Sequence, residues 1–247
     1  IVGGMSVQQF VFLERVEGYG NEIMKGHNFD PKDTMWLFSH TGINAVNIDI
    51  ALESREKGMK VIVFGATGSV GRLAVESMLA DGHEVTAFAR RPDALEISHP
   101  RLNRLPGNAL RLEEVCSAVA GQDAVVITLG SGASRRSVVR SRGTEHIVKA
   151  MQRHGVDRLI CQSTLGAGDS WSNLNFFWKR IMFGLLLRPV FLVHERQEQR
   201  VRESGLDWTI VRPSAFTDGP ADGNYKVDIP AGEGGLRLKI SRADIAG

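Results

Sequence analysis

The sequence has few cysteines and no excess of charge of either sign. Its 247 residues include two cysteines, Cys116 and Cys161, and neither belongs to a C-x-x-C pair or to a Cys/His cluster with metal-ligand spacing. Both lie in apolar-periodic stretches, which favours buried free thiols, no metal site and a reducing, cytoplasmic location. The 30 basic and 28 acidic residues give a formal net charge of +2. Nothing in this balance indicates a nucleic acid or an anionic membrane as a partner.

Long apolar runs are also absent. The longest, IMFGLLLRPVFLV at residues 181–193, is interrupted by Arg188 and Pro189, and it is shorter than the roughly 20 residues that a membrane-spanning helix needs. The N-terminus lacks the basic, apolar and small-residue order of a signal peptide. With 43% hydrophobic and 23% charged residues, the composition is typical of a soluble globular protein of one or two domains.

From Met59 onward, short apolar runs alternate with segments of helical periodicity. Strands are predicted at residues 60–66, 83–90, 101–107, 123–130, 157–164 and 206–214, and helices at residues 70–82, 112–122, 143–155 and 196–205. This alternation indicates βαβ units and a parallel sheet, and nearly continuous apolar strands indicate helices on both faces. Right-handed crossovers then give an α/β fold with a doubly wound parallel Rossmann sheet. The closing ISRADIAG predicts the start of a further helix.

A glycine-rich turn follows the first of these strands. Gly65, Gly68 and Gly71 are spaced G-x-x-G-x-x-G between a strand and a helix. Such glycines permit a tight turn, let the backbone approach a pyrophosphate, and let the helix pack against the strand. The free N–H groups and the positive end of the helix dipole then bind the anion. The alternative is a turn that needs glycine but holds no ligand. The predicted dinucleotide site comprises Gly65, Thr67, Gly68, Ser69, Val70 and Gly71.

The end of the second strand distinguishes the two nicotinamide cofactors. NAD sites place Asp or Glu there to bind the ribose 2′-OH. This chain has Arg90 and Arg91 instead, and Asp93 comes later, after a proline. A guanidinium suits a 2′-phosphate because it is planar and permanently charged. The predicted cofactor is therefore NADP(H), unless both arginines are solvated loop residues.

Other cofactor-contacting positions follow from topology. Ligands of doubly wound sheets lie outside the carboxyl ends of the strands. Those ends add Asn108, Ala109, Thr128, Leu129, Gly130, Ser163, Pro213 and Ser214 to the predicted site.

Several of these segments together resemble a known family. They are VFGATGSVGR, FARRP, AGQDAVVITLG, VDRLICQST, RESGLDWTIVRPS and ISRADIAG. Taken together, they resemble atypical short-chain dehydrogenases/reductases, above all the NAD(P)H-binding, NmrA-like group that includes biliverdin reductase B-like flavin reductases. The resemblance covers residues 59–247. It implies that the glycine turn, Arg90 and Arg91 bind the cofactor and that Ser163 faces the nicotinamide. Asn108 stands where relatives often have Asp beside the adenine.

The chain departs from the typical family at the catalytic tyrosine. The usual Tyr-x-x-x-Lys motif, in which tyrosine donates a proton and lysine lowers its pKa, is missing. The only tyrosines are Tyr19 and Tyr225, while Val190 and His194 occupy the expected tyrosine and lysine positions. Biliverdin reductase B-like relatives also lack the pair. Hydride delivery from a well-placed nicotinamide, with protons from water, can therefore suffice.

Two residues remain as catalytic candidates. His194 has an intrinsic pKa range that suits a general acid, and Ser163 can orient a ligand through its hydroxyl. The alternatives are a surface or ribose-contacting histidine and a simple strand-end hydrogen bond. The nearby Glu195 and Glu198 are expected to be solvated helix charges.

The first 58 residues resemble a different family. Residues 15–62 look like part of a sugar isomerase (SIS) domain of the phosphosugar-binding kind. This resemblance implies a phosphate-binding loop at residues 39–42 and a helix at residues 43–57, although only about a third of such a domain is present. The predicted domains are an SIS-like strand–loop–helix extension, residues 1–58, and an NAD(P)-binding Rossmann domain, residues 59–247. A natural fusion, an engineered chimera and an altered gene start all fit this join.

The sequence as a whole predicts an NADPH-dependent reductase. Its substrate would be a flat conjugated small molecule, such as a flavin, a quinone or a similar carbonyl compound. Residues 171–189 are expected either to cover that substrate as an apolar lid or to pack into the core or a homodimer face. The alternatives for the whole chain are an NADP(H)-binding redox sensor without turnover and a fused α/β protein with no native activity.

Overall fold

The computed structural model describes residues 58–130, 138–174, 179–180 and 188–246, apart from residues 224, 227, 228, 231, 234, 235 and 237. The predicted N-terminal strand, phosphate-binding loop and helix lie outside the described residues, as do residues 175–178 and 181–187 of the predicted lid. Residues Lys60–Ala80 and Glu84–Gly247 form one compact unit, to which all the elements below belong.

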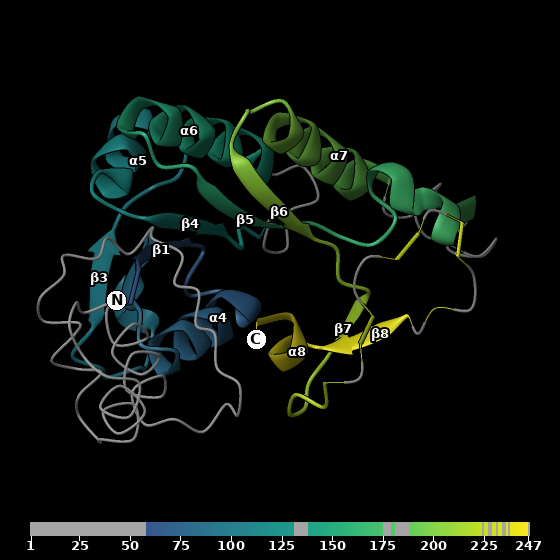
Figure 1. Ribbon diagram of the computed structural model, residues 1–247, viewed down its shortest axis with the longest axis horizontal. Helices are drawn as coiled ribbons and strands as arrows, with labels where there is room; N and C mark the ends of the chain where they lie inside the picture. The colour runs from purple at the N-terminus through teal and green to yellow at the C-terminus, as the bar shows by residue number, and fades with distance from the viewer. Residues whose placement is uncertain are drawn as a thin grey trace, which may run out of the picture. The chain divides into compact units, whose positions relative to one another are not determined.

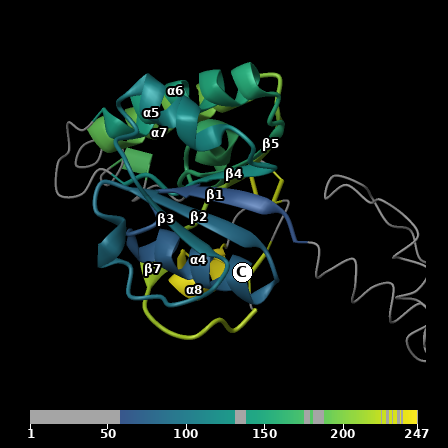
Figure 2. The same ribbon diagram turned by 90° about the vertical axis from the view of Figure 1, so that its left-hand side faces the viewer.

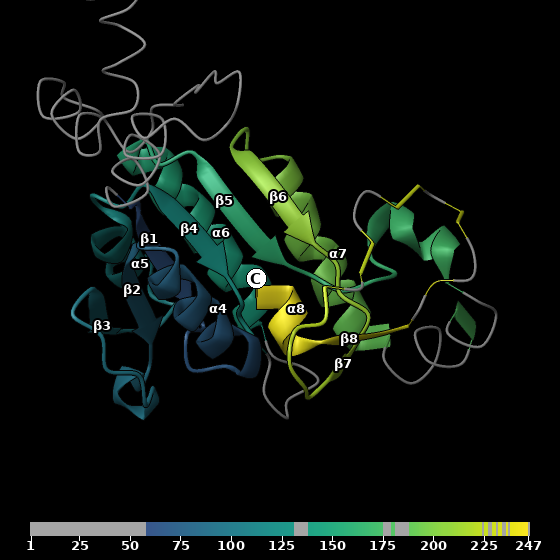
Figure 3. The same ribbon diagram turned by 60° about the horizontal axis from the view of Figure 1, so that its bottom comes forward.

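A sheet of six parallel strands forms the centre of this unit, in the order β3-β2-β1-β4-β5-β6 (Figure 3). The strands are β1 (Lys60–Phe64), β2 (Glu84–Ala89), β3 (Leu102–Pro106), β4 (Ala124–Ile127), β5 (Arg158–Gln162) and β6 (Asp207–Val211). Strand β1 has β2 and β4 as its neighbours. The strand order confirms the predicted doubly wound Rossmann sheet, in which β2 and β3 are added on one side of β1 and β4, β5 and β6 on the other.

Helices cover both faces of the sheet. Figures 1 and 2 show α5, α6 and α7 on one face, and α4 and α8 on the other. The helices are α4 (Ser69–Ala80), α5 (Leu112–Val119), α6 (Val139–His154), α7 (Arg188–Arg202) and α8 (Arg242–Ala246). The core between the sheet and α5, α6 includes Ile62, Ile127 and Leu159 from strands and Ile147 and Met151 from α6, all fully buried. These strands are apolar on both faces because helices exclude water from both.

Both cysteines are buried and free, as the sequence predicts. No helix in the described part of the chain is long and apolar enough to cross a membrane.

Two helices begin earlier than their patterns predict. Helix α6 begins at Val139 rather than at residue 143, and α7 begins at Arg188 rather than at residue 196. Pro189 is compatible with the first turn of α7, since a proline at the start of a helix loses no intrahelical hydrogen bond. The earlier start places Val190, Phe191 and His194 on a helix. The sequence also did not predict the two-stranded parallel sheet of β7 (Ala215–Thr217) and β8 (Lys239–Ser241), because three residues are too few to show a periodicity.

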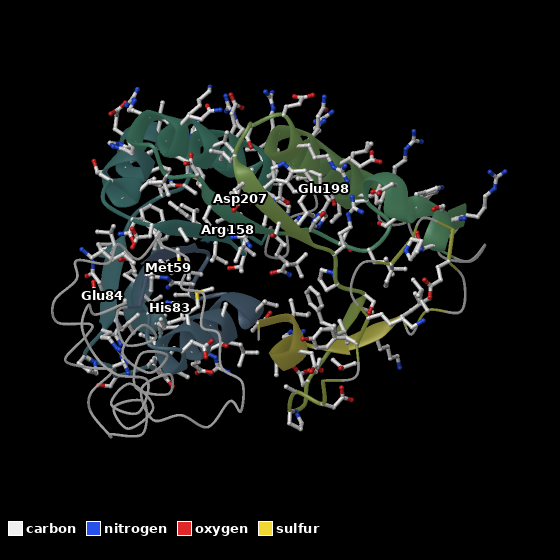
Figure 4. All side chains as sticks on the ribbon, in the orientation of Figure 1. Met59, His83, Glu84, Arg158, Glu198 and Asp207 are labelled. Carbon is white, nitrogen blue, oxygen red and sulfur yellow. The ribbon has the colours of Figure 1, made fainter. Side chains whose placement is uncertain are left out.

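A buried ion pair connects α7 to the end of β6. Glu198 on α7 (Figure 4) is 2% exposed, so the expectation of a solvated charge is wrong. Its carboxylate accepts hydrogen bonds from Nε and Nη2 of Arg212 at 2.9 and 2.6 Å. Arg212 also pairs with Asp169 at 2.7 Å. The paired geometry offsets the cost of burying the charges, and it fixes α7 against the loop that follows β6. In contrast, the Arg158–Asp207 pair across β5 and β6 in Figure 4 is at 3.5 Å and solvent-exposed.

Candidate active site

A cavity of about 1040 Å³ lies at the carboxyl ends of the parallel strands. Its wall is made by the β1–α4 turn, by the segments that follow β2, β3, β4, β5 and β6, and by α7. This is where a doubly wound sheet binds its ligands, because neighbouring crossovers leave the sheet in opposite directions there.

Most of the residues that the sequence predicts for the site line this one cavity. They are Gly65, Thr67, Gly68, Ser69, Val70, Arg90, Asn108, Ala109, Thr128, Leu129, Gly130, Ser163, His194, Pro213 and Ser214. Gly71 and Arg91 do not line it. Gly71 is buried in the packing of α4 against β1 and β4, and Arg91 is exposed at the start of the short 3-10 helix Pro92–Ala94.

The glycine turn is packed so tightly that two of its glycines cannot be replaced without movement. Gly65 has a φ of +91°, and a Cβ there would lie 2.8 Å from the carbonyl oxygen of Thr128. A Cβ on Gly71 would overlap the Gly65 carbonyl and lie 2.7 Å from Thr128 Oγ1. Gly68 is less confined, with the Gly65 oxygen 3.1 Å from a Cβ placed there. Its missing side chain therefore mainly leaves room for the cavity.

Helix α4 begins beside this space at Ser69 and has no acidic residue in its first turn. The positive end of the helix dipole and the first free N–H groups therefore face the cavity without a competing carboxylate. This arrangement suits the binding of a phosphate group.

A network of hydrogen bonds after β3 shapes the part of the cavity wall that residues 107–110 form. The Asn108 amide donates to Glu114 Oε2 at 2.7 Å, and Asn108 Oδ1 accepts from the Leu110 amide at 3.0 Å. The hydrogen bond from Asn108, followed by that from Arg111, holds the pKa of the Glu114 carboxyl below its usual value. A Cβ on Gly107 would overlap the Phe88 ring. Sequence reasoning missed the role of Glu114, because the hydrogen bond depends on how the loop folds back onto α5.

The other end of the cavity contains two buried polar groups without partners. Ser163 is 2% exposed and His194 is 7% exposed, and neither Ser163 Oγ nor His194 Nδ1 has a hydrogen-bond partner. Buried polar groups are nearly always paired, so both groups are suited to a bound ligand. Burial, with a smaller contribution from the charge of Arg140, lowers the pKa of His194 to about 3. The imidazole is therefore buried rather than on the helix surface, and it is neutral at pH 7.

The rest of this end is apolar apart from one arginine. Leu165, Leu174, Val190, Phe191 and Phe216 line it, and Trp171 packs against Phe191 with ring centroids 5.2 Å apart. None of the described lining residues is a tyrosine or a lysine, so nothing among them replaces the missing motif. The described residues also include no group of three potential metal ligands.

Arg140 is a charged residue of the cavity that sequence reasoning missed. It lies in the first turn of α6, and its Nε donates to the carbonyl oxygen of Leu129 at 3.1 Å. The predicted helix begins at residue 143, three residues after Arg140, so no sequence pattern placed this side chain at the strand ends.

Comparison with known families agrees with this geometry. The family described as NAD(P)H-binding matches residues 65–247. The chain belongs to this family. The SIS domain family matches residues 2–66, in agreement with the resemblance of the N-terminal segment.

Individual relatives support the same family. A protein named as an uncharacterized sugar epimerase, YhfK of Bacillus subtilis, is 28% identical over 76% of this chain and 85% of its own length. A 3-beta-hydroxysteroid dehydrogenase of Mycolicibacterium neoaurum is 37% identical over 41% of this chain, and the match covers only 31% of that enzyme. Among solved structures, ChuY, an anaerobilin reductase of Escherichia coli O157:H7, is 27% identical with a TM-score of 0.59, over 76% of this chain and 86% of ChuY. This chain is thus similar to a named dehydrogenase and a named reductase.

The two glycines nearest the start of α4 are predicted to respond differently to a methyl group. Gly71→Ala places a Cβ against backbone, so we expect it to lower the free energy of unfolding by about 1–3 kcal/mol. Gly68→Ala should lower it by less than about 1 kcal/mol and still weaken NADPH binding at least tenfold, because its Cβ occupies the phosphate side. Urea unfolding and NADPH titration of both variants measure this. Equal effects of the two substitutions on the free energy of unfolding would contradict the assignment of Gly71 to the packing of α4 and of Gly68 to the phosphate side of the cavity.

Burial of His194 predicts a pH-dependent loss of stability. The folded-state pKa of about 3 lies below the ordinary value of 6.5, so below pH 6.5 the unfolded chain binds a proton that the folded chain does not. Stability therefore falls as the pH falls from 6.5 towards 3, and at pH 5 this histidine accounts for about 2 kcal/mol of the loss. Urea unfolding at pH 8 and pH 5 should show a smaller loss for His194→Gln than for the unchanged chain. His154→Gln, at the exposed end of α6, is the control. If His194→Gln loses as much free energy of unfolding between pH 8 and pH 5 as the unchanged chain, the prediction is contradicted.

Proposed function

We propose that the chain is an NADPH-dependent oxidoreductase that transfers hydride to a flat conjugated small molecule, such as a flavin, a quinone or a similar carbonyl compound. The observation that carries this proposal is the continuity of the cavity. The glycine turn, Arg90 and the unpartnered Ser163 and His194 line the same space, which also has an apolar wall. A dinucleotide and a second, apolar ligand are the pair of molecules that such a lining suits.

The residues present fit a dinucleotide. Gly68 leaves open the space that a side chain would fill, next to the first free amides of α4, and Thr67 and Ser69 add hydroxyls. Arg90 lines the cavity at the end of β2, where a guanidinium suits a 2′-phosphate. The bound cofactor supplies the hydride.

The side chains at the Ser163 end position the reactants and exclude water. The Ser163 hydroxyl and the neutral imidazole of His194 are the donors and acceptors available to orient a ring against the apolar wall. Because a neutral imidazole carries no extra proton, the proton that accompanies reduction comes from water in this proposal. Enclosure by Phe191, Leu174 and Leu165 strengthens the polar contacts, since electrostatic interactions are less screened away from water.

A redox sensor is the second candidate, and the lining of the cavity favours it in one respect. No described residue there is the tyrosine or lysine with which typical members transfer a proton. Such a sensor would bind NADP(H) and release it unchanged. A fused protein without native activity would instead fail to bind NADPH until residues 1–58 were removed. On the evidence of the two buried free cysteines, we also propose a cytoplasmic location.

The choice of cofactor is tested by titrating NADPH and NADH separately into the purified chain. We expect NADPH to bind more tightly by about 2 kcal/mol or more, since hydrogen bonds to charged groups are worth about 1.5–3 kcal/mol each. Arg90→Ala should remove most of this preference and leave NADH binding unchanged. Arg91→Ala is the matched control, because Arg91 is adjacent to Arg90 but does not line the cavity. Equal affinities for the two cofactors before and after substitution would refute the assignment to NADP(H).

Turnover separates the enzyme from the sensor. We expect steady NADPH oxidation with at least one member of a panel of flavins and quinones, followed by the loss of the near-ultraviolet absorbance that the reduced nicotinamide has and the oxidised one lacks, with the absorbance of each acceptor subtracted. Tight NADPH binding without oxidation across the whole panel would favour the sensor instead.

A further inference from the structure

Three segments that form the apolar end of the cavity are joined by one network of charged side chains. The segments are α7, the chain that follows β6, and residues 164–174 after β5. Glu198 on α7 accepts two hydrogen bonds from Arg212, directly after β6, at 2.9 and 2.6 Å. The same guanidinium lies 2.7 Å from a carboxylate oxygen of Asp169 in the third segment. Arg202, one turn after Glu198, lies 3.2 Å from the same oxygen of Asp169.

The members of this network differ in their exposure to solvent. Glu198 and Arg212 are largely buried, whereas the side chain of Asp169 is 63% exposed. Loss of either buried partner would leave the other as an unpaired buried charge. Loss of Asp169 leaves the Glu198–Arg212 pair intact and detaches only the third segment, in which Asp169 belongs to the 3-10 helix Gly168–Asn173. The backbone of this helix packs directly on the pair, because a Cβ on Gly168 would lie 2.9 Å from Arg212 Nη2.

This 3-10 helix supports the apolar wall of the cavity. Trp171 packs against Phe191 of α7, with ring centroids 5.2 Å apart. Leu174, directly after the helix, is 5% exposed and lines the cavity, as Phe191 does. At the same end, Asn173 Nδ2 donates to the carbonyl oxygen of Pro230 at 2.7 Å. The helix is therefore held at one end by a charged group and at the other by an amide, with Trp171 between them.

We propose that Asp169 is a positioning residue of the acceptor site. By pairing with Arg212 and Arg202, it holds the 3-10 helix against α7 and so fixes the apolar wall against which the acceptor lies. Asp169 does not itself line the cavity, so it acts through Trp171 and Leu174. This inference rests on the proposed function, because that function places the acceptor at the apolar wall.

Amide hydrogen exchange of the full chain, followed by mass spectrometry, tests whether Asp169 holds the helix. Several backbone amides of this segment, including those of Leu165 and Ala167, donate hydrogen bonds, so their exchange reports local opening. Asp169→Ala should raise the exchange rate of peptides from residues 164–174 about threefold to tenfold and leave peptides from β1, β4 and α6 unchanged. Asp169→Asn should have a smaller effect, because its amide oxygen still accepts a hydrogen bond but carries no charge.

Steady-state kinetics test the consequence for the acceptor, with riboflavin and menadione as two uncharged probes. At saturating NADPH, Asp169→Ala should raise the KM of the acceptor about threefold or more and change kcat by less than about twofold, because the acceptor must then order the wall as it binds. Asp169→Asn should again lie between Asp169→Ala and the unchanged chain. The dissociation constant of NADPH should change by less than about twofold, because the phosphate-binding amides belong to α4, a different element.

Asp207→Ala is the matched control. Asp207 is also an exposed aspartate in an ion pair, at 3.5 Å from Arg158, but it does not line the cavity or join the network of Asp169. Its loss should change neither the exchange of residues 164–174 nor the KM of either acceptor.

Three outcomes would overturn the inference. They are unchanged exchange of residues 164–174 in Asp169→Ala, faster exchange throughout the chain, and faster exchange of residues 164–174 with an unchanged KM. The exchange measurement needs neither cofactor nor acceptor, which keeps this inference separate from the proposed function. If neither probe is reduced, the proposed function loses its support, whereas faster exchange confined to residues 164–174 still supports the role of Asp169 in holding the wall.

Discussion

Helix α4 begins so close to the ends of β1 and β4 that neither Gly65 nor Gly71 has room for a side chain. A Cβ on either residue would meet Thr128 or the backbone of the turn itself. This close approach brings the first amides of α4 to the carboxyl edge of the sheet. It also leaves the space beside Gly68 open, and the segments after β2, β3, β4, β5 and β6 surround the same space. The other features of the site depend on this packing, because it fixes where a phosphate can reach free N–H groups.

The opposite end of the cavity depends on a second, more distant constraint. Glu198 and Arg212 form a buried, doubly hydrogen-bonded pair that holds α7 against the loop after β6. One turn before Glu198 on α7, His194 enters the cavity as a buried neutral imidazole. Arg140 approaches from α6, and Ser163 follows β5. Charge is thus arranged in two places: Arg90 on the β2 side of β1, and Arg140 on the β4 side.

The parts of the fold that the sequence predicted are those encoded locally. The apolar strands, the spacing of Gly65, Gly68 and Gly71, and the order of strands and helices from β1 to β6 can be read from neighbouring residues. The cavity residues at strand ends followed because the topology of a doubly wound sheet is restricted. Positions that depend on tertiary packing were harder to predict. Nothing local indicated that Glu198 would be buried or that Asn108 would bond to Glu114. The early start of α6, which places Arg140 at the cavity, gave no periodic signal.

A crystal structure of the chain grown with NADPH tests the central claim most directly. The account predicts the pyrophosphate within hydrogen-bond distance of the backbone amides at the start of α4, the 2′-phosphate beside the Arg90 guanidinium and the nicotinamide next to Ser163. Electron density for the cofactor elsewhere on the chain, or side chains filling the space beside Gly68 at saturating NADPH, would contradict it.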